Sequence, residues 1–222
     1  MLPLRDTRPS SSRPVMTMAI IIVNVMVFIY QLTLDDFSLN HFIAVYGMIP
    51  ARFQVVDLFT SMWLHGGWMH LIGNMWFLWV FGDNIEEALG RFNYLLFYVL
   101  CGVAAGLVHL MFNADSRIPA VGASGAIAGV MGAYLVKFPK ARVLTLIFIF
   151  VFFTTMELPA WLILIYWFAI QIFSGAGSVG YSHLSQGGVA WFAHIGGFIV
   201  GMLLIKLLPN RDRYFKDPGY RW

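Results

Sequence analysis

Residues 121–134 read VGASGAIAGVMGAY, an uncharged run in which small residues recur at every fourth position. If the run is helical, Gly125, Gly129 and Ala133 lie on one face of the helix. Faces built from small residues let two helix backbones approach closely in lipid, where tight packing drives association. The stretch therefore predicts a helix that packs closely against another helix inside a membrane.

A later sequence, WFAHIGGFIVG, supplies a candidate for that second helix. Its residues Ala193, Gly197 and Gly201 repeat the four-residue spacing. A serine precedes one small-residue face and a histidine lies beside the other. If the two faces meet, Ser124 and His194 come close to hydrogen-bonding distance.

The composition excludes a water-soluble domain. Of the 222 residues, 59% are apolar and 11% are charged, whereas soluble domains carry about 25% charged residues. A bilayer core takes about 20 apolar residues per helix. Apolar runs predict six spans, at 15–33, 68–85, 92–113, 122–138, 157–174 and 191–208. The predicted fold is an all-α polytopic membrane protein with six transmembrane helices.

The positions of Lys and Arg predict the orientation of these spans. With the N-terminus inside, all but Arg52 and Arg117 of the 14 Lys and Arg residues fall on the cytoplasmic side, as the positive-inside rule expects. A membrane domain at 15–208 then lies between cytoplasmic tails at 1–14 and 209–222. The net charge of +3 reflects this bias, and we expect no nucleic-acid partner.

Two segments fall between the predicted spans. Residues 34–67 are too long for a turn and too amphipathic for a plain linker, so we expect a first loop that lies at the membrane surface. Residues 143–156 are apolar, but a seventh span there would move the basic C-terminal tail outside. We therefore expect a short interfacial or partly inserted piece.

Polar side chains inside a bilayer cost free energy, so they mark candidate functional sites. Clusters of such residues lie at the starts of the second, fourth and sixth spans. Because these three spans all run from outside to inside, the clusters lie at a similar depth in the membrane. The clusters hold His65, His70 and Asn74; Ser124 between Gly122 and Gly125; and His194 ahead of Gly197. A serine becomes a nucleophile when an imidazole takes its proton. No Asp or Glu lies close in sequence to Ser124 or His194, which favours a dyad over a triad.

Attack on an amide creates an oxyanion, which requires hydrogen-bond donors positioned in advance. The side-chain NH2 of Asn74, a ring N–H of His70 and the backbone N–H of Ser124 at a helix start are candidate donors. Gly122 and Gly125 would let a substrate backbone come close. The histidine pair before and within the second span lacks a third clustered ligand, so we expect no metal and no cofactor.

These motifs resemble those of the rhomboid family of intramembrane serine proteases. The match consists of G-x-S-G at Gly122–Gly125, A-H-x-x-G at Ala193–Gly197, H-x-x-x-N at His70–Asn74 with His65 upstream, and E-x-x-x-G at Glu86–Gly90. It covers roughly residues 15–208. The resemblance implies a rhomboid-like six-helix bundle in which Ser124 is the nucleophile and His194 the general base. It also implies that single-span membrane proteins are cut near the outer membrane face.

The resemblance implies further roles. His70 and Asn74 would form the oxyanion hole with the Ser124 amide, and His65 would support the first loop or a water network. The fifth span and the loop at 175–190 would move for substrate entry.

Two positions depart from the family pattern. Ala128 stands where many members have an aromatic residue that packs on the histidine, and Ala51 precedes Arg52 where members often have Trp-Arg.

Two other functional classes compete with a protease. A non-proteolytic rhomboid-like protein that binds transmembrane helices would normally lack the serine or the histidine, and this chain has both. A transporter or channel would carry polar residues through both leaflets, whereas the inner halves of these spans are nearly bare of them. The expected partners are transmembrane substrates and the lipid bilayer, and the sequence sets no oligomeric state. The absence of a Ser-rich amphipathic presequence favours a bacterial plasma membrane.

Overall fold

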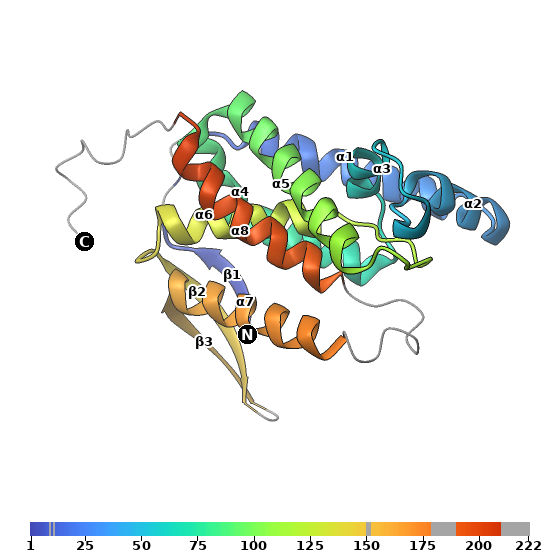
Figure 1. Ribbon diagram of the computed structural model, residues 1–222. Coiled ribbons are helices and arrows are strands. Elements are labelled where there is room, and N and C mark those ends of the chain that lie inside the picture. The colour runs from blue at the N-terminus through green and yellow to red at the C-terminus, as the bar shows by residue number, and fades with distance from the viewer. Residues whose placement is uncertain (9, 11, 150–151, 179–189, 210–222) are drawn as a thin grey trace.

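The computed structural model describes residues 1–8, 10, 12–149, 152–178 and 190–209. A helix occupies each of the six ranges predicted as spans (Figure 1). These helices are α1 (Val15–Leu32), α4 (Trp68–Leu89), α5 (Arg91–Phe112), α6 (Ser124–Lys137), α7 (Ala160–Ser178) and α8 (Trp191–Leu207). Three of them, α1, α5 and α7, are long and apolar enough to cross a membrane, and α6 and α8 are shorter apolar helices. The helical part is that of an all-α polytopic membrane protein.

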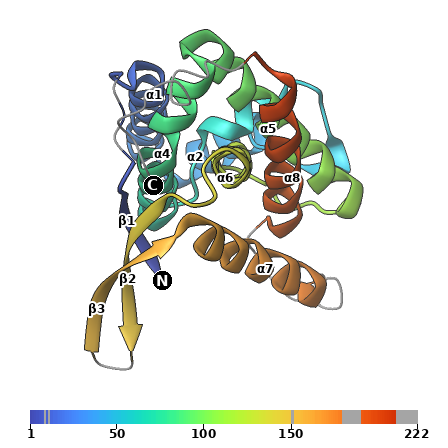
Figure 2. The same ribbon diagram turned by 90° about the vertical axis from the view of Figure 1, so that its left-hand side faces the viewer.

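Helix α6 lies at the centre of the bundle. Figure 2 shows it end-on, with α4, α5 and α8 around it. Every residue from Gly125 to Tyr134 is buried. More than half of these residues are Gly or Ala, and small side chains let the neighbouring helices approach closely. Ser124, the first residue of α6, therefore lies at one end of the most buried helix.

A three-stranded antiparallel sheet is present that was not predicted from the sequence. Strand β1 (Leu2–Asp6) pairs with β2 (Arg142–Ile149), which pairs with β3 (Phe152–Pro159). The segment before α1 therefore contains a strand, and β2 and β3, which cover most of 143–156, form an antiparallel pair that projects from the helices (Figures 1 and 2). Its Val, Ile, Thr and Phe residues favour strands, a preference that counting apolar residues alone does not detect. The fifth helix accordingly begins at Ala160, three residues later than predicted.

The N-terminal strand is fastened to the helical bundle by side-chain hydrogen bonds. The indole N–H of Trp76 donates to the backbone oxygen of Pro3 at 2.6 Å. The carboxylate of Asp6 accepts from the hydroxyl of Tyr134 at 2.6 Å and from the amide of Asn84 at 2.7 Å. Strand β1 thus joins the hairpin on one side and helices α4 and α6 on the other.

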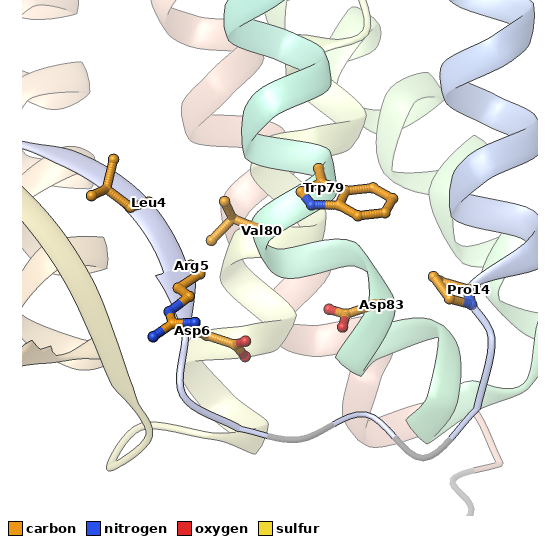
Figure 3. Close-up of a pocket in the computed structure, with 7 residues that line it drawn as sticks. All are labelled: Leu4, Arg5, Asp6, Pro14, Trp79, Val80 and Asp83. Carbon is orange, nitrogen blue, oxygen red and sulfur yellow. The ribbon is translucent and has the colours of Figure 1, made fainter.

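A pocket of about 170 Å³ lies between β1 and α4. Its lining residues are Leu4, Arg5, Asp6, Pro14, Trp79, Val80 and Asp83. Figure 3 shows the carboxyl groups of Asp6 and Asp83 pointing toward one another. Burial raises the pKa of Asp6 to about 7, although the hydrogen bond from Tyr134 acts in the opposite direction. Asp6 is therefore partly protonated near neutral pH.

The first loop contains helices α2 (Asp36–Tyr46) and α3 (Asp57–Thr60) and the 3₁₀ turns η1 (Pro50–Arg52) and η2 (Ser61–Trp63). Asp35 caps α2 by accepting from the backbone N–H of Ser38 at 2.8 Å. Reciprocal backbone hydrogen bonds between Met48 and Ala120 tie this loop to the segment before α6. The guanidinium of Arg52 donates to the oxygen of Ala44 at 2.8 Å. That the first loop lies at a membrane surface stays a prediction.

The E-x-x-x-G motif joins three helices. The Glu86 carboxylate accepts from the backbone N–H of Met16 at 2.9 Å and from the backbone N–H and hydroxyl of Thr17 at 2.7 and 2.9 Å. It therefore caps the start of α1, whose first N–H groups have no helical partner. Gly90, with φ of +78°, ends α4 and begins α5 in a conformation that favours glycine.

Candidate active site

Ser124 and His194 form a hydrogen-bonded pair. The distance between Ser124 Oγ and His194 Nε2 is 2.8 Å. Ser124 begins α6, and His194 lies in the first turn of α8 with 8% of its surface exposed. The two residues are 70 positions apart in sequence, so it is the packing of the two helices that brings them together.

The predicted contact between the two small-residue faces is confirmed, and it sets this distance. A Cβ atom added to Gly197 would collide with the backbone oxygen of Gly125, and one added to Gly201 would collide with that of Gly129. A Cβ added to Gly132 would meet the oxygen of Phe198 in the same way. The backbones of α6 and α8 are therefore in direct contact at three levels.

A third residue, Gln171 of α7, completes a hydrogen-bonded chain. Its Oε1 lies 2.8 Å from His194 Nδ1. An amide oxygen only accepts hydrogen bonds, so Nδ1 carries the ring proton and Nε2 presents its lone pair to Ser124. Gln171 was not among the site residues predicted from the sequence. The signal was present, because it is a polar residue within the fifth predicted span, where polarity is costly.

Aromatic rings hold the imidazole of His194 in place. The ring of Trp167 lies 5.7 Å from it at an interplanar angle of 36°, and that of Trp191 lies 6.4 Å away, edge-on. Ala128 is buried in α6 and has no ring, so the rings beside His194 come from α7 and α8. Trp167 was not predicted as a site residue, because nothing in the sequence shows which face of α7 meets α8.

His70 and Asn74 face Gly122, which lies two residues before the serine. A Cβ atom on Gly122 would lie 2.7 Å from His70 Nε2 and 3.5 Å from Asn74 Nδ2. His70 Nδ1 accepts from the backbone N–H of Gly66 at 3.4 Å, so the ring proton is on Nε2. Both nitrogens are therefore donors beside the backbone that leads into Ser124.

Gly122 makes this approach possible. Its φ of +124° favours glycine, and its N–H donates to the backbone oxygen of Ser61 at 2.9 Å. Gly125, one residue after the serine, contacts the side chains of Ala105 and Ala193. Its role is therefore in helix packing, whereas Gly122 borders the donors.

His65 orients the amide of Asn74. Its Nε2 lies 3.0 Å from Asn74 Nδ2, and its backbone exchanges two hydrogen bonds with the side chain of Gln31 in α1. Burial, and secondarily the neighbouring His70, lowers the pKa of His65 to about 4. The neutral ring accepts one amide hydrogen of Asn74 and leaves the other free to point toward Gly122.

A small cavity of about 40 Å³ borders Ser124. It is lined by residues of the first loop, α5, α6 and α8, among them Ser61 and His109. The described residues contain no group of three or more His, Cys, Asp or Glu that could hold a metal ion. The loop predicted to move, 175–190, lies mostly outside the described residues, as does 210–222 of the C-terminal tail.

The arrangement has the parts that nucleophilic acyl transfer requires. A serine hydroxyl contacts an imidazole whose second nitrogen is held by an acceptor, and two side-chain donors face Gly122, two residues before the serine. Such a serine can lose its proton as it attacks, and such donors can stabilise an oxyanion.

Comparison with known proteins gives a family match. Residues 52–211 match the Rhomboid domain. The chain is 30% identical to Rhomboid-like protein 11, chloroplastic, of Arabidopsis thaliana over 84% of its own length and 66% of the relative. It is 33% identical to RHOMBOID-like protein 1 of the same plant over 75% of this chain and 38% of the relative. For Rhomboid protein 1, mitochondrial, of Saccharomyces cerevisiae, the identity is 30% over 67% of this chain and 40% of the relative. The chain thus spans less than two thirds of these curated relatives.

Proposed function

The chain belongs to the rhomboid family of membrane proteins, and from this premise we propose that it is an intramembrane serine endopeptidase. The observation that carries the proposal is the 2.8 Å contact between Ser124 Oγ and His194 Nε2. A protein that only binds transmembrane helices has no need of a serine activated in this way.

The first half of the reaction forms an acyl-enzyme. Ser124 Oγ attacks the carbonyl carbon of the scissile peptide while its proton moves to His194 Nε2. Negative charge develops on the carbonyl oxygen, and the N–H groups of His70, Asn74 and the Ser124 backbone stabilise it. Collapse of this intermediate breaks the C–N bond. His194 returns the proton to the departing amine.

The second half releases the acyl group. Water attacks the ester carbon while His194 Nε2 takes its proton, through the same oxyanion geometry. Collapse breaks the bond to Ser124 Oγ, which recovers its proton from the imidazole, and the carboxyl product leaves. The base must be neutral at the start of each half, and the hydrogen bond from Nδ1 to Gln171 selects the neutral tautomer whose Nε2 can accept the proton.

The proposed substrates are single-span membrane proteins, cut near the outer face of the bilayer. This is supported by the position of Ser124, His194 and His70 at the starts of three helices that run outside to inside in the six-span topology. The topology is itself a proposal, supported by the bias of Lys and Arg toward one side. Two of the relatives carry chloroplastic and mitochondrial in their names, so they give no support to the bacterial plasma membrane predicted from the sequence.

The test uses purified protein in liposomes with a reporter single-span substrate and a fluorophosphonate probe for activated serines. Ser124→Ala and His194→Ala are compared with Ser116→Ala and His41→Ala, which change the same residue types outside the site. We expect the first pair to lower cleavage at least about 10³-fold and to abolish labelling, and the second pair to leave both unchanged.

Two results would contradict the proposal. Cleavage that persists in Ser124→Ala would exclude this serine as the nucleophile. Tight binding of the substrate by the wild-type protein, with neither cleavage nor labelling, would identify a helix-binding protein without protease activity.

A further inference from the structure

Gln171 is a buried polar residue on an apolar helix, and both ends of its amide are engaged. Only 4% of its surface is exposed. Its Nε2 donates to the backbone oxygen of Trp167, one turn earlier in α7, at 3.1 Å. Its Oε1 lies 2.8 Å from His194 Nδ1. Burying an amide without hydrogen-bond partners costs free energy. The hydrogen bonds to Trp167 and His194 offset this cost for Gln171.

The bond to Trp167 decides which end of the amide faces the histidine. Because Nε2 is used on the carbonyl of its own helix, Oε1 is directed at α8. An oxygen acceptor at Nδ1 selects the tautomer with the proton on Nδ1. The other tautomer would place two acceptors against each other there and would direct an N–H at Ser124 Oγ.

We propose that Gln171 is the positioning residue of the Ser124–His194 pair, and that its amide does what a carboxylate does in a triad, without a charge. This inference rests on the proposed function. Among the described residues, no carboxylate hydrogen-bonds to His194, whose other neighbours, Trp167 and Trp191, offer aromatic rings. Gln171 therefore fixes both the tautomer and the rotation of the imidazole.

The neutral partner suits its surroundings. Helix α7 is apolar enough to cross a membrane, and a carboxylate there would require a compensating charge. An amide supplies the acceptor without that requirement, although it stabilises the imidazolium less. Since α7 meets the bundle mainly through α8, with a smaller contact to α6, the correct tautomer also requires α7 to be seated against α8.

The test compares Gln171→Met, which keeps the length but removes the acceptor, with Gln171→Glu, which keeps an acceptor. Ile172→Met, an exposed position on the same helix, is the control. We expect Gln171→Met to lower kcat and the rate of fluorophosphonate labelling together, by about 10- to 100-fold, with KM changed less than about threefold. Gln171→Glu is expected to recover at least half of the loss on a logarithmic scale. The control should match the wild type.

A second measurement does not depend on activity. In protein labelled with ¹⁵N-histidine, side-chain spectra distinguish a proton on Nδ1 from one on Nε2, and the His194 signal is assigned by its loss in His194→Ala. The wild type and Ser124→Ala should both show His194 protonated on Nδ1, and Gln171→Met should not. An unchanged tautomer or an unchanged kcat in Gln171→Met would overturn the inference. If the wild type neither cleaves nor labels, the proposed function fails, and the spectra still decide the role of Gln171.

Discussion

Removing the Glu86 carboxylate should separate the start of α1 from the end of α4. Glu86 has 2% of its surface exposed and accepts three hydrogen bonds from the first turn of α1. A hydrogen bond to a charged group contributes about 1.5–3 kcal/mol, and a buried donor left without a partner costs about 1–3 kcal/mol. Each of the three hydrogen bonds therefore contributes measurably to the free energy of unfolding.

The magnitude follows from the two carboxylate oxygens. In Glu86→Gln one oxygen remains and can serve either Met16 or Thr17, while the new NH2 faces the other donor. We expect a loss of about 2–4 kcal/mol in the free energy of unfolding. Glu86→Ala leaves all three donors without a partner, and the loss should reach about 4 kcal/mol or more.

Unfolding in mixed micelles of increasing SDS content, followed by the fluorescence of the 8 Trp residues, measures this loss. Glu157→Gln, an exposed change in β3, is the control and should stay within about 0.5 kcal/mol of the wild type. Thr17→Val completes a double-mutant cycle with Glu86→Gln, for which we expect a coupling energy of about 1 kcal/mol. A coupling below about 0.3 kcal/mol, or a Gln variant as stable as the wild type, would refute the capping argument.

Three further predictions concern the site and the N-terminal strand. Gly122→Ala places a Cβ 2.7 Å from His70 Nε2 at a φ of +124°, so cleavage should fall at least about 10²-fold while SDS resistance falls little; full activity would contradict it. Trp167→Ala removes the ring packed on His194 and should lower kcat about tenfold, whereas Trp167→Phe should restore most of it; equal kinetics of both variants would exclude ring support. Because the pKa of Asp6 is raised to about 7, its stabilisation of the docked strand is complete below about pH 4 and is lost as the pH rises to about 7. Between about pH 4 and 7, the backbone amides of residues 2–6 should therefore exchange their hydrogens faster than the intrinsic pH dependence of exchange predicts. Asp6→Asn should abolish this extra acceleration.

The sequence predicted the helices and the pairing of Ser124 with His194 because both depend on local, periodic features. Apolar runs of sufficient length mark helices in a membrane protein, and small residues four apart mark the faces that meet. The order of the polar clusters along alternate helices then placed Asn74 and His70 on the same side. These conclusions needed no knowledge of how the helices are arranged in space.

The parts that were missed depend on contacts between distant segments. Whether Gln171 faces lipid or His194 depends on the rotation of α7, which neither its length nor its composition specifies. The sheet was missed because β1 pairs with residues about 140 positions later, and an apolar run such as 142–149 is compatible with a strand or a buried helix until its partner is known. Trp167 was missed because, in the sequence alone, it cannot be told from a tryptophan that lies at the membrane interface.

The pairing of β1 with β2 imposes an order on biosynthesis. Strand β1 leaves the ribosome before β2. Because Leu2 pairs with Leu146 and the Thr7 amide with the Arg142 oxygen, these partners do not exist until α1, α4, α5 and α6 have been made. Until then Asp6 also lacks the hydroxyl of Tyr134. Closing so long a loop is slow compared with local helix formation. The strand therefore cannot join the sheet before β2 has been made, and its docking also needs α4 and α6, which carry the side chains that bind it.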